Sequence, residues 1–190
     1  MTSVRGHVVC AAVTCLCLCA ASARAEDGTF GVAVGATASM FPPPDTGETI
    51  KLAPGLVIGF YGVIPILKSV SIMPELLYVQ KYSERTDPTK TSLRVQYVEL
   101  PILAKLPFLW GTYFAEGVSF GFPVENSGLA PNLARITSPD VAIVIGGGYN
   151  LKKHLAVEFR YESSLRQVSN VPDALAQRGR SYMAIAKLHF

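Results

Sequence analysis

Alternation between apolar residues and polar or small residues, at every second position, is the feature that most constrains this sequence. In the clearest segment, 153–163, the odd positions from Leu155 to Tyr161 are apolar or aromatic. Its even positions carry charged residues such as Glu158 and Arg160. A period of two is the signature of a β-strand whose two faces meet different environments. The sequence therefore predicts an all-β protein built from amphipathic strands.

Eight segments of this kind follow one another, and the links between them alternate in length. The segments are 28–40, 50–62, 70–82, 92–106, 111–122, 140–149, 153–163 and 181–190. Long loops are expected at 41–49, 83–91, 123–139 and 164–180, with short links elsewhere. Transmembrane barrels show this rhythm, with long extracellular loops and short periplasmic turns, and about ten residues let a tilted strand cross a bilayer. We expect an eight-stranded antiparallel up-and-down transmembrane β-barrel.

The first 25 residues have the pattern of a secretory signal peptide. Arg5 supplies a positive charge, residues 8–21 are uncharged, and the small residues Ala23 and Ala25 frame a cleavage site. Cleavage after Ala25 would leave residues 26–190 as one barrel domain. All four cysteines lie in this leader, so the sequence offers no disulfide or thiolate metal site elsewhere. We therefore expect export to the bacterial outer membrane.

Net charge gives no sign of a nucleic-acid partner. The formal charge of +3 falls to +1 when Arg5 and Arg24 leave with the leader, because 15 basic residues then face 14 acidic ones. Nucleic-acid-binding domains carry a basic patch or stripe instead. The expected partners are outer-membrane lipids and a surface ligand bound through the long loops, and we expect a monomer.

A soluble lipocalin-type barrel also shows alternation, but it lines a cavity with its apolar face and turns a densely charged face to water. Here the polar faces of the first, second, fifth and sixth segments carry mainly Gly, Ala, Ser and Thr. Such small side chains suit a crowded interior better than a solvated exterior. The last segment also favours the membrane barrel, because its apolar face ends on the aromatic residue Phe190.

Five short motifs stand out on the predicted strands. They are 55–60 (GLVIGF), 74–81 (PELLYVQK), 97–103 (YVELPIL), 146–149 (GGGY) and 159–162 (FRYE). Together they resemble the outer-membrane protein β-barrel domain of the PorT-like, "porin family protein" type. The resemblance implies the fold and the location, but a family name does not establish a pore.

One residue departs from the expected pattern. Glu116 is in phase with Phe114 and Val118 on an apolar face. A β-bulge beside it, or a position close to the rim of the barrel, would accommodate its charge.

The polar faces of the strands should point into the barrel and bring charged side chains together there. These lumen residues are Glu75, Lys81, Glu99, Lys105, Glu158, Arg160, Glu162 and Lys187. Four are acidic and four are basic, and an unpaired buried charge costs several kcal/mol. Since an eight-stranded barrel has room only for its own side chains, we predict a salt-bridged plug without a continuous channel, with Glu99 and Arg160 as the members to test first. The inward glycines expected to make room are Gly31, Gly35, Gly55, Gly59, Gly117, Gly121, Gly146 and Gly148.

Aromatic residues fall mostly near the predicted strand ends, where they would form girdles at the two membrane interfaces. They are Tyr61, Tyr78, Tyr82, Trp110, Tyr113, Tyr149 and Tyr161.

Signatures of catalysis and cofactor binding are weak. His154 and His189, the histidines beyond the leader, are expected at the periplasmic end, and two histidines without cysteine make a poor metal site. Ser163, Ser164 and Ser169 lie near the predicted outer rim, but a hydroxyl nucleophile needs a base and no histidine is expected there. We expect a non-enzymatic protein with a structural or surface-interaction role, without catalytic residues, metal or cofactor. The alternatives are a narrow porin, a ligand-binding barrel or, less favoured, a lipid A modifying enzyme.

Overall fold

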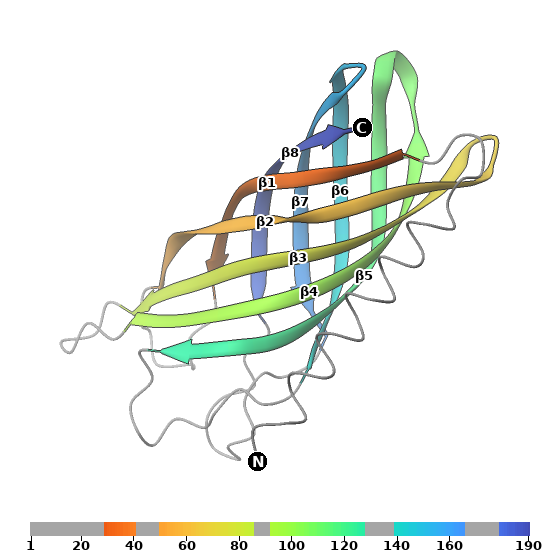
Figure 1. The fold of residues 1–190 in the computed structure, drawn as a ribbon. Helices are drawn as coiled ribbons and strands as arrows, with labels where there is room; N and C mark the ends of the chain where they lie inside the picture. The colour runs from red at the N-terminus through yellow and green to blue at the C-terminus, as the bar shows by residue number, and fades with distance from the viewer. Residues whose placement is uncertain (1–28, 41–49, 86–91, 128–138, 166–178) are drawn as a thin grey trace.

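The computed structural model describes residues 29–40, 50–85, 92–127, 139–165 and 179–190, and in them eight antiparallel strands close into one barrel (Figure 1). The strands are β1 (Thr29–Met40), β2 (Ile50–Leu67), β3 (Val70–Arg85), β4 (Ser92–Pro107), β5 (Thr112–Ser127), β6 (Asp140–Lys152), β7 (Leu155–Ser164) and β8 (Arg180–His189). Each strand pairs with the next one in sequence, and β1 pairs with β8 to complete the closure. The predicted fold class is confirmed, whereas the predicted leader lies outside the described residues.

The two ends of the barrel differ in their connections. Short links join β2 to β3, β4 to β5 through the 3-10 helix η1 (Leu109–Gly111), and β6 to β7, and we name this the turn end. The start of β1 and the end of β8 also lie at the turn end, toward the upper right of Figure 1. The opposite end, here the loop end, is where residues 41–49, 86–91, 128–138 and 166–178 connect the strands. The predicted long loops therefore fall almost entirely outside the described residues.

Several strands extend beyond their predicted ends. β2 continues to Leu67 and β5 to Ser127. Prolines made these continuations hard to see in the sequence, because proline has no N–H to give to a sheet and is tolerated mainly at edges and bulges. In β2 the pairing with β3 shifts register around Pro54 and again at Pro65. The strand thus passes its prolines at irregular positions rather than ending before them.

Backbone hydrogen bonds fix the last residues of the chain in the barrel wall. The N–H of His189 donates to the carbonyl oxygen of His154 at 3.1 Å, and the N–H of Phe190 donates to the carbonyl oxygen of Phe30 at 2.9 Å. The end of β8 is therefore bonded on both of its sides, to the β6–β7 link and to β1.

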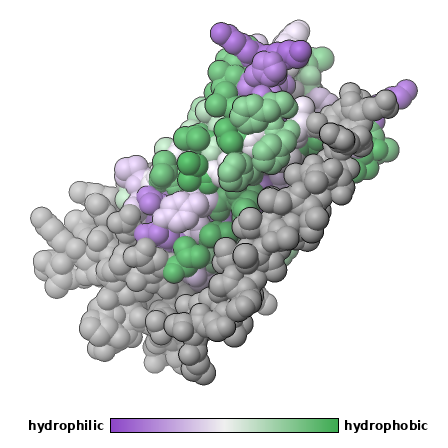
Figure 2. Space-filling model, viewed as in Figure 1, coloured by the Kyte–Doolittle hydropathy of each residue, from purple (hydrophilic) through white to green (hydrophobic). Residues whose placement is uncertain are grey.

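Large apolar side chains form a band around the outside of the barrel (Figure 2). They alternate with inward residues along each strand, as expected for a barrel whose outer face meets hydrocarbon. Exposed members include Leu56, Ile58, Phe60, Ile102, Phe120, Phe122, Ile143, Ile145 and Phe159. Figure 2 shows hydrophilic residues beyond the band at the upper end.

Across the described residues, no helix combines the length and apolar character needed to cross a membrane.

Two of the tyrosines predicted for the girdles point into the lumen instead. Tyr61 and Tyr113 are 1% and 2% exposed. Their strand phase explains the error, since Tyr61 shares its face with the buried Val57 and Tyr113 shares its face with the buried Ala115. The other predicted girdle residues stay on the outside, and Trp110 in η1 is 87% exposed.

Glu116 lies on the outer surface within a regular stretch of sheet. It pairs with Ala104 of β4 and Ile145 of β6, and its side chain is exposed. The register shift between β4 and β5 lies at Gln96 and Tyr97, so the bulge considered for Glu116 is not there. Its carboxylate therefore faces the apolar band, four residues after β5 begins.

Candidate functional site: the charged lumen

The inward phase of the strands carries the predicted charged residues into the lumen. Seven of the eight are at most 5% exposed, namely Glu75, Lys81, Glu99, Glu158, Arg160, Glu162 and Lys187. Lys105 is only partly buried, and its Nζ lies 4.1 Å from the centre of the Tyr113 ring. Buried charges at this density require close partners, because transfer of a lone ion out of water is very costly.

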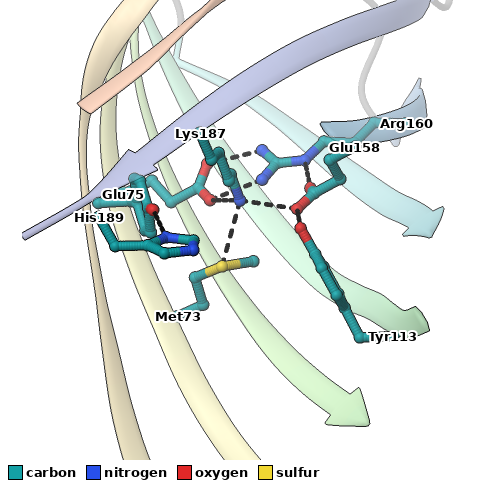
Figure 3. Close-up of polar contacts among 8 residues, drawn as sticks. Met73, Glu75, Tyr113, Glu158, Arg160, Lys187 and His189 are labelled. Atoms are coloured by element: carbon teal, nitrogen blue, oxygen red, sulfur yellow. Dashed lines mark hydrogen bonds and ion pairs between the residues drawn. The ribbon is translucent and has the colours of Figure 1, made fainter. Parts of the chain in front are cut away.

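Four of these residues, Glu75, Glu158, Arg160 and Lys187, form what we name the inner cluster, in the turn-end half of the lumen (Figure 3). Arg160 donates from Nη1 and Nη2 to the two carboxylate oxygens of Glu75, at 2.6 Å each, and from Nε to Glu158. Lys187 Nζ lies 2.8 Å from Glu75 Oε1 and 2.7 Å from Glu158 Oε2. Two carboxylates thus meet two cations, and the two-pronged Arg160–Glu75 contact is the strong form of such a pair.

Uncharged and aromatic side chains surround the inner cluster. The hydroxyl of Tyr113 donates to Glu158 Oε2 at 2.8 Å, and Lys187 Nζ lies 3.2 Å from Met73 Sδ. Lys187 also lies over the Tyr61 ring, at 4.9 Å from its centre. The Tyr61 hydroxyl in turn is hydrogen-bonded to His189 Nδ1, so the network reaches the turn end.

A second group, the outer cluster, lies in the loop-end half and consists of Lys81, Glu99, Glu162 and Asp140. Lys81 Nζ lies 2.6 Å from Glu99 Oε1 and 3.1 Å from Glu162 Oε2. Asp140 stands beside them, since Gly121 pairs with Glu99 on one side and with Asp140 on the other. The hydroxyl of Ser164 donates to Asp140 Oδ2 at 2.7 Å.

Asp140 is a charged lumen residue that the sequence analysis did not predict. It is 7% exposed and is the first residue of β6, in the same inward phase as Ala142 and Val144. The alternation of β6 places Asp140 on the inward face, although it is the first residue of the strand.

The structure divides the single predicted network into two. On β3, the apolar residues Leu77 and Val79 occupy the inward positions between Glu75 and Lys81. Leu103, Val144, Met183 and Ile185 belong to the same buried apolar group. Within the described part of the chain, no ion pair joins the inner cluster to the outer cluster.

Glycines make room for the large inward side chains. Gly146 pairs with Arg160, and a Cβ on Gly146 would lie 3.0 Å from Arg160 Cγ. A Cβ on Gly148 would overlap the Tyr113 ring, and one on Gly31 would lie 2.7 Å from two atoms of the Tyr61 ring. The lumen can therefore hold these side chains only because the facing positions have none.

Among the residues that the structure describes, the others considered for chemistry do not assemble into a catalytic group. The hydroxyl of Ser164 is hydrogen-bonded to Asp140, and Ser169 lies outside the described residues. His154 Nδ1 lies 3.2 Å from the carbonyl oxygen of His189, so both histidines are at the turn end, remote from Ser163 and Ser164. Among the residues that the structure describes, no group of three or more His, Cys, Asp or Glu could hold a metal ion.

A closed eight-stranded barrel with an apolar outside and a charged lumen defines a small membrane β-barrel protein. The family described as "Outer membrane protein beta-barrel domain" matches residues 23–170, and the chain belongs to this family. The predicted family and its outer-membrane location are thereby confirmed, whereas the PorT-like subtype stays a prediction. A comparison with curated proteins gives no match.

Two solved structures show a similar fold. One is Ail, the attachment invasion locus protein of Yersinia pestis, in complex with the heparin analogue sucrose octasulfate, with 13% identity and a TM-score of 0.54. The other is Neisserial surface protein A (NspA), with 10% identity and a TM-score of 0.55. In both cases the match covers 87% of this chain and 100% of the other. At these identities the likeness concerns the fold alone.

Proposed function

We propose that this protein is a non-enzymatic barrel of the outer membrane whose lumen is closed by the inner cluster and whose role is structural or one of interaction at the cell surface. The inner cluster carries the proposal, because Glu75, Glu158, Arg160 and Lys187 are buried, balanced in charge and bonded to one another. In a barrel of this size the interior is just wide enough for side chains to fill it. A small solute would have to break these ion pairs to pass.

In this proposal the turn end faces the periplasm and the loop end faces outward, since outer-membrane barrels keep short turns on the periplasmic side. Both ends of the mature chain are then periplasmic after removal of residues 1–25. The lipids of the membrane contact the apolar band, and a monomer is sufficient because closure leaves no unpaired strand edge. A surface ligand would bind at the loop end, since loops on a rigid scaffold commonly carry binding residues.

Single-channel recording in a planar bilayer tests the closed lumen. The refolded protein should give no stable conductance, because the inner cluster blocks the path. The variant Arg160→Ala provides the comparison, since it removes one of the two side chains that bridge Glu75 and Glu158. Large and stable conductance from the unaltered protein would favour the narrow porin instead.

Protease treatment of intact cells tests the orientation. Trypsin should cut in the segments 128–138 and 166–178, which contain Arg135, Arg166 and Arg178. Cleavage confined to Lys152 and Lys153 at the turn end would reverse the proposed orientation.

A further inference from the structure

Unpartnered polar atoms gather in the outer half of the lumen. Five buried side-chain atoms find no hydrogen-bond partner among the described residues. They are Tyr97 Oη, Glu99 Oε2, Ser119 Oγ, Asp140 Oδ1 and Glu162 Oε1. None belongs to the inner cluster. Buried polar atoms are nearly always bonded in native proteins, so a group of five in one place points to something that they bind.

Among the described side chains, charge in this half of the lumen is also unbalanced. The described side chains of the outer cluster are three carboxylates, from Glu99, Asp140 and Glu162, and one ammonium, from Lys81. All four residues are at most 7% exposed. Uncompensated buried charge is strongly unfavourable. A cation bound here would reduce this excess of negative charge.

Gly121 lies against several of these residues. A Cβ at Gly121 would lie 3.2 Å from Tyr97 Cδ1, 3.5 Å from Asp140 Cβ and 3.7 Å from Glu99 Cγ. Tyr97 and Ser119, whose hydroxyls are both unpartnered, are 0% and 2% exposed and share the inward faces of β4 and β5 with Glu99 and Gly121. The bare backbone at Gly121 thus lies where carboxylates and hydroxyls from three strands meet.

We propose that the outer cluster binds the primary ammonium group of a small organic cation. Lys81 shows the mode of binding, because its ammonium takes one oxygen of Glu99 and one oxygen of Glu162. A second ammonium, with its N–H donors, would take the free oxygens of those two carboxylates, and Asp140 would add negative charge beside it. A directly coordinated metal ion fits less well, since no three carboxylates of the described residues could hold one.

The inference goes beyond the proposed function, because it concerns the loop-end half of the lumen and holds whether or not the inner cluster blocks conduction. Recording of conductance and measurement of cation binding can therefore fail independently.

Isothermal titration calorimetry of the refolded full chain in detergent, with ethylammonium chloride as the probe, tests the site. Tetramethylammonium chloride is the comparison, because it has the same charge but no N–H donor. Sodium chloride at equal ionic strength controls for screening. Ethylammonium should bind saturably at one site, and the other two cations should not.

Variants then locate the binding. Asp140→Asn removes one of the three carboxylates without touching Lys81, and should weaken ethylammonium binding by about tenfold, because it removes a negative charge close to the bound cation. Gly121→Ala adds a methyl group beside the site and should weaken binding without changing charge. Glu116→Gln is the matched control, since it removes a carboxylate from the outer surface and should leave binding unchanged.

A boiled-versus-unboiled gel shift shows that each variant has folded, and Gly121→Ala serves if Asp140→Asn does not fold. Equal binding of ethylammonium and tetramethylammonium, unchanged binding by a folded Asp140→Asn or Gly121→Ala variant, or no saturable binding by the unaltered protein would each overturn the proposal.

Discussion

The two halves of the lumen use the same kinds of side chain in different ways. In the inner cluster two carboxylates meet two cations, and Arg160 and Lys187 each contact both carboxylates. In the outer cluster the only described cation, Lys81, contacts two of the three carboxylates, and each of the three leaves one oxygen unbonded. Burial of charged side chains alone therefore does not indicate a structural role. A balanced cluster can stabilise the barrel by itself, whereas an unbalanced one retains capacity for a ligand.

The largest effect should come from the inner cluster. Arg160→Ala should lower the free energy of unfolding by ~3 to 5 kcal/mol, because it leaves two carboxylates buried with Lys187 alone. Urea unfolding of the refolded barrel, followed by tryptophan fluorescence, measures this loss. Arg180→Ala, at an exposed arginine on β8, is the control and should have little effect. Equal losses in the two variants would contradict a special role for the inner cluster.

The same chemical change in the two halves sharpens the comparison. Glu75→Gln should lower the free energy of unfolding by ~2 to 3 kcal/mol, since it removes a charge that Arg160 and Lys187 both contact. Glu99→Gln should lower the free energy of unfolding by less than about 1 kcal/mol. Lys81 keeps its contact with Glu162, and the excess of negative charge in the outer cluster falls. Parallel urea titrations measure both. A loss for Glu99→Gln as great as that for Glu75→Gln would mean that the two halves do not differ.

Neighbouring glycines test the packing around the inner cluster. Gly148→Ala should destabilise the barrel by ~1 to 3 kcal/mol, because the added methyl group would overlap the Tyr113 ring. Gly147→Ala is the control, since a Cβ there meets only the carbonyl oxygen of Tyr113, at 3.5 Å. Similar midpoints of thermal unfolding for the two variants would indicate that the ring moves aside easily.

The smallest effect concerns Glu116, whose carboxylate lies on the outer surface of the barrel. Glu116→Leu should stabilise the barrel by about 1 kcal/mol in lipid vesicles, because a charge that faces hydrocarbon is unfavourable to a degree set by its depth. Val118→Leu, on the same face of β5, should change little. If Glu116→Leu weakens the barrel, the carboxylate has a favourable partner on the outer surface.

Strand phase explains both the success and the errors of the sequence predictions. Because side chains alternate strictly, the inward positions of Glu75, Arg160 and Gly146 could be deduced without a structure. The partners could not, since they depend on how strands far apart in sequence face each other across the lumen. Glu75 and Lys187, for example, are 112 residues apart.

The errors arose where position along a strand was used in place of phase. Tyr61 and Tyr113 were placed in the girdles because they lie near strand ends, although both are on inward faces. Asp140, the first residue of β6, is also in the inward phase but is absent from the predicted set of lumen residues. A rule based on phase alone would have assigned all three to the lumen.

The hydrogen bonds that hold the end of β8 have a consequence for the order of assembly. β8 is the last of the eight described strands in sequence order, and its pairing with β1 joins the two strands that are most distant in sequence. Contacts of such large separation are costly in loop entropy and tend to form late. β8 also carries Lys187, so until it docks, Glu75 and Glu158 share the single cation Arg160. Docking of β8 therefore closes the wall and neutralises the inner cluster in one step, and a partly assembled barrel would attract its own final strand by charge.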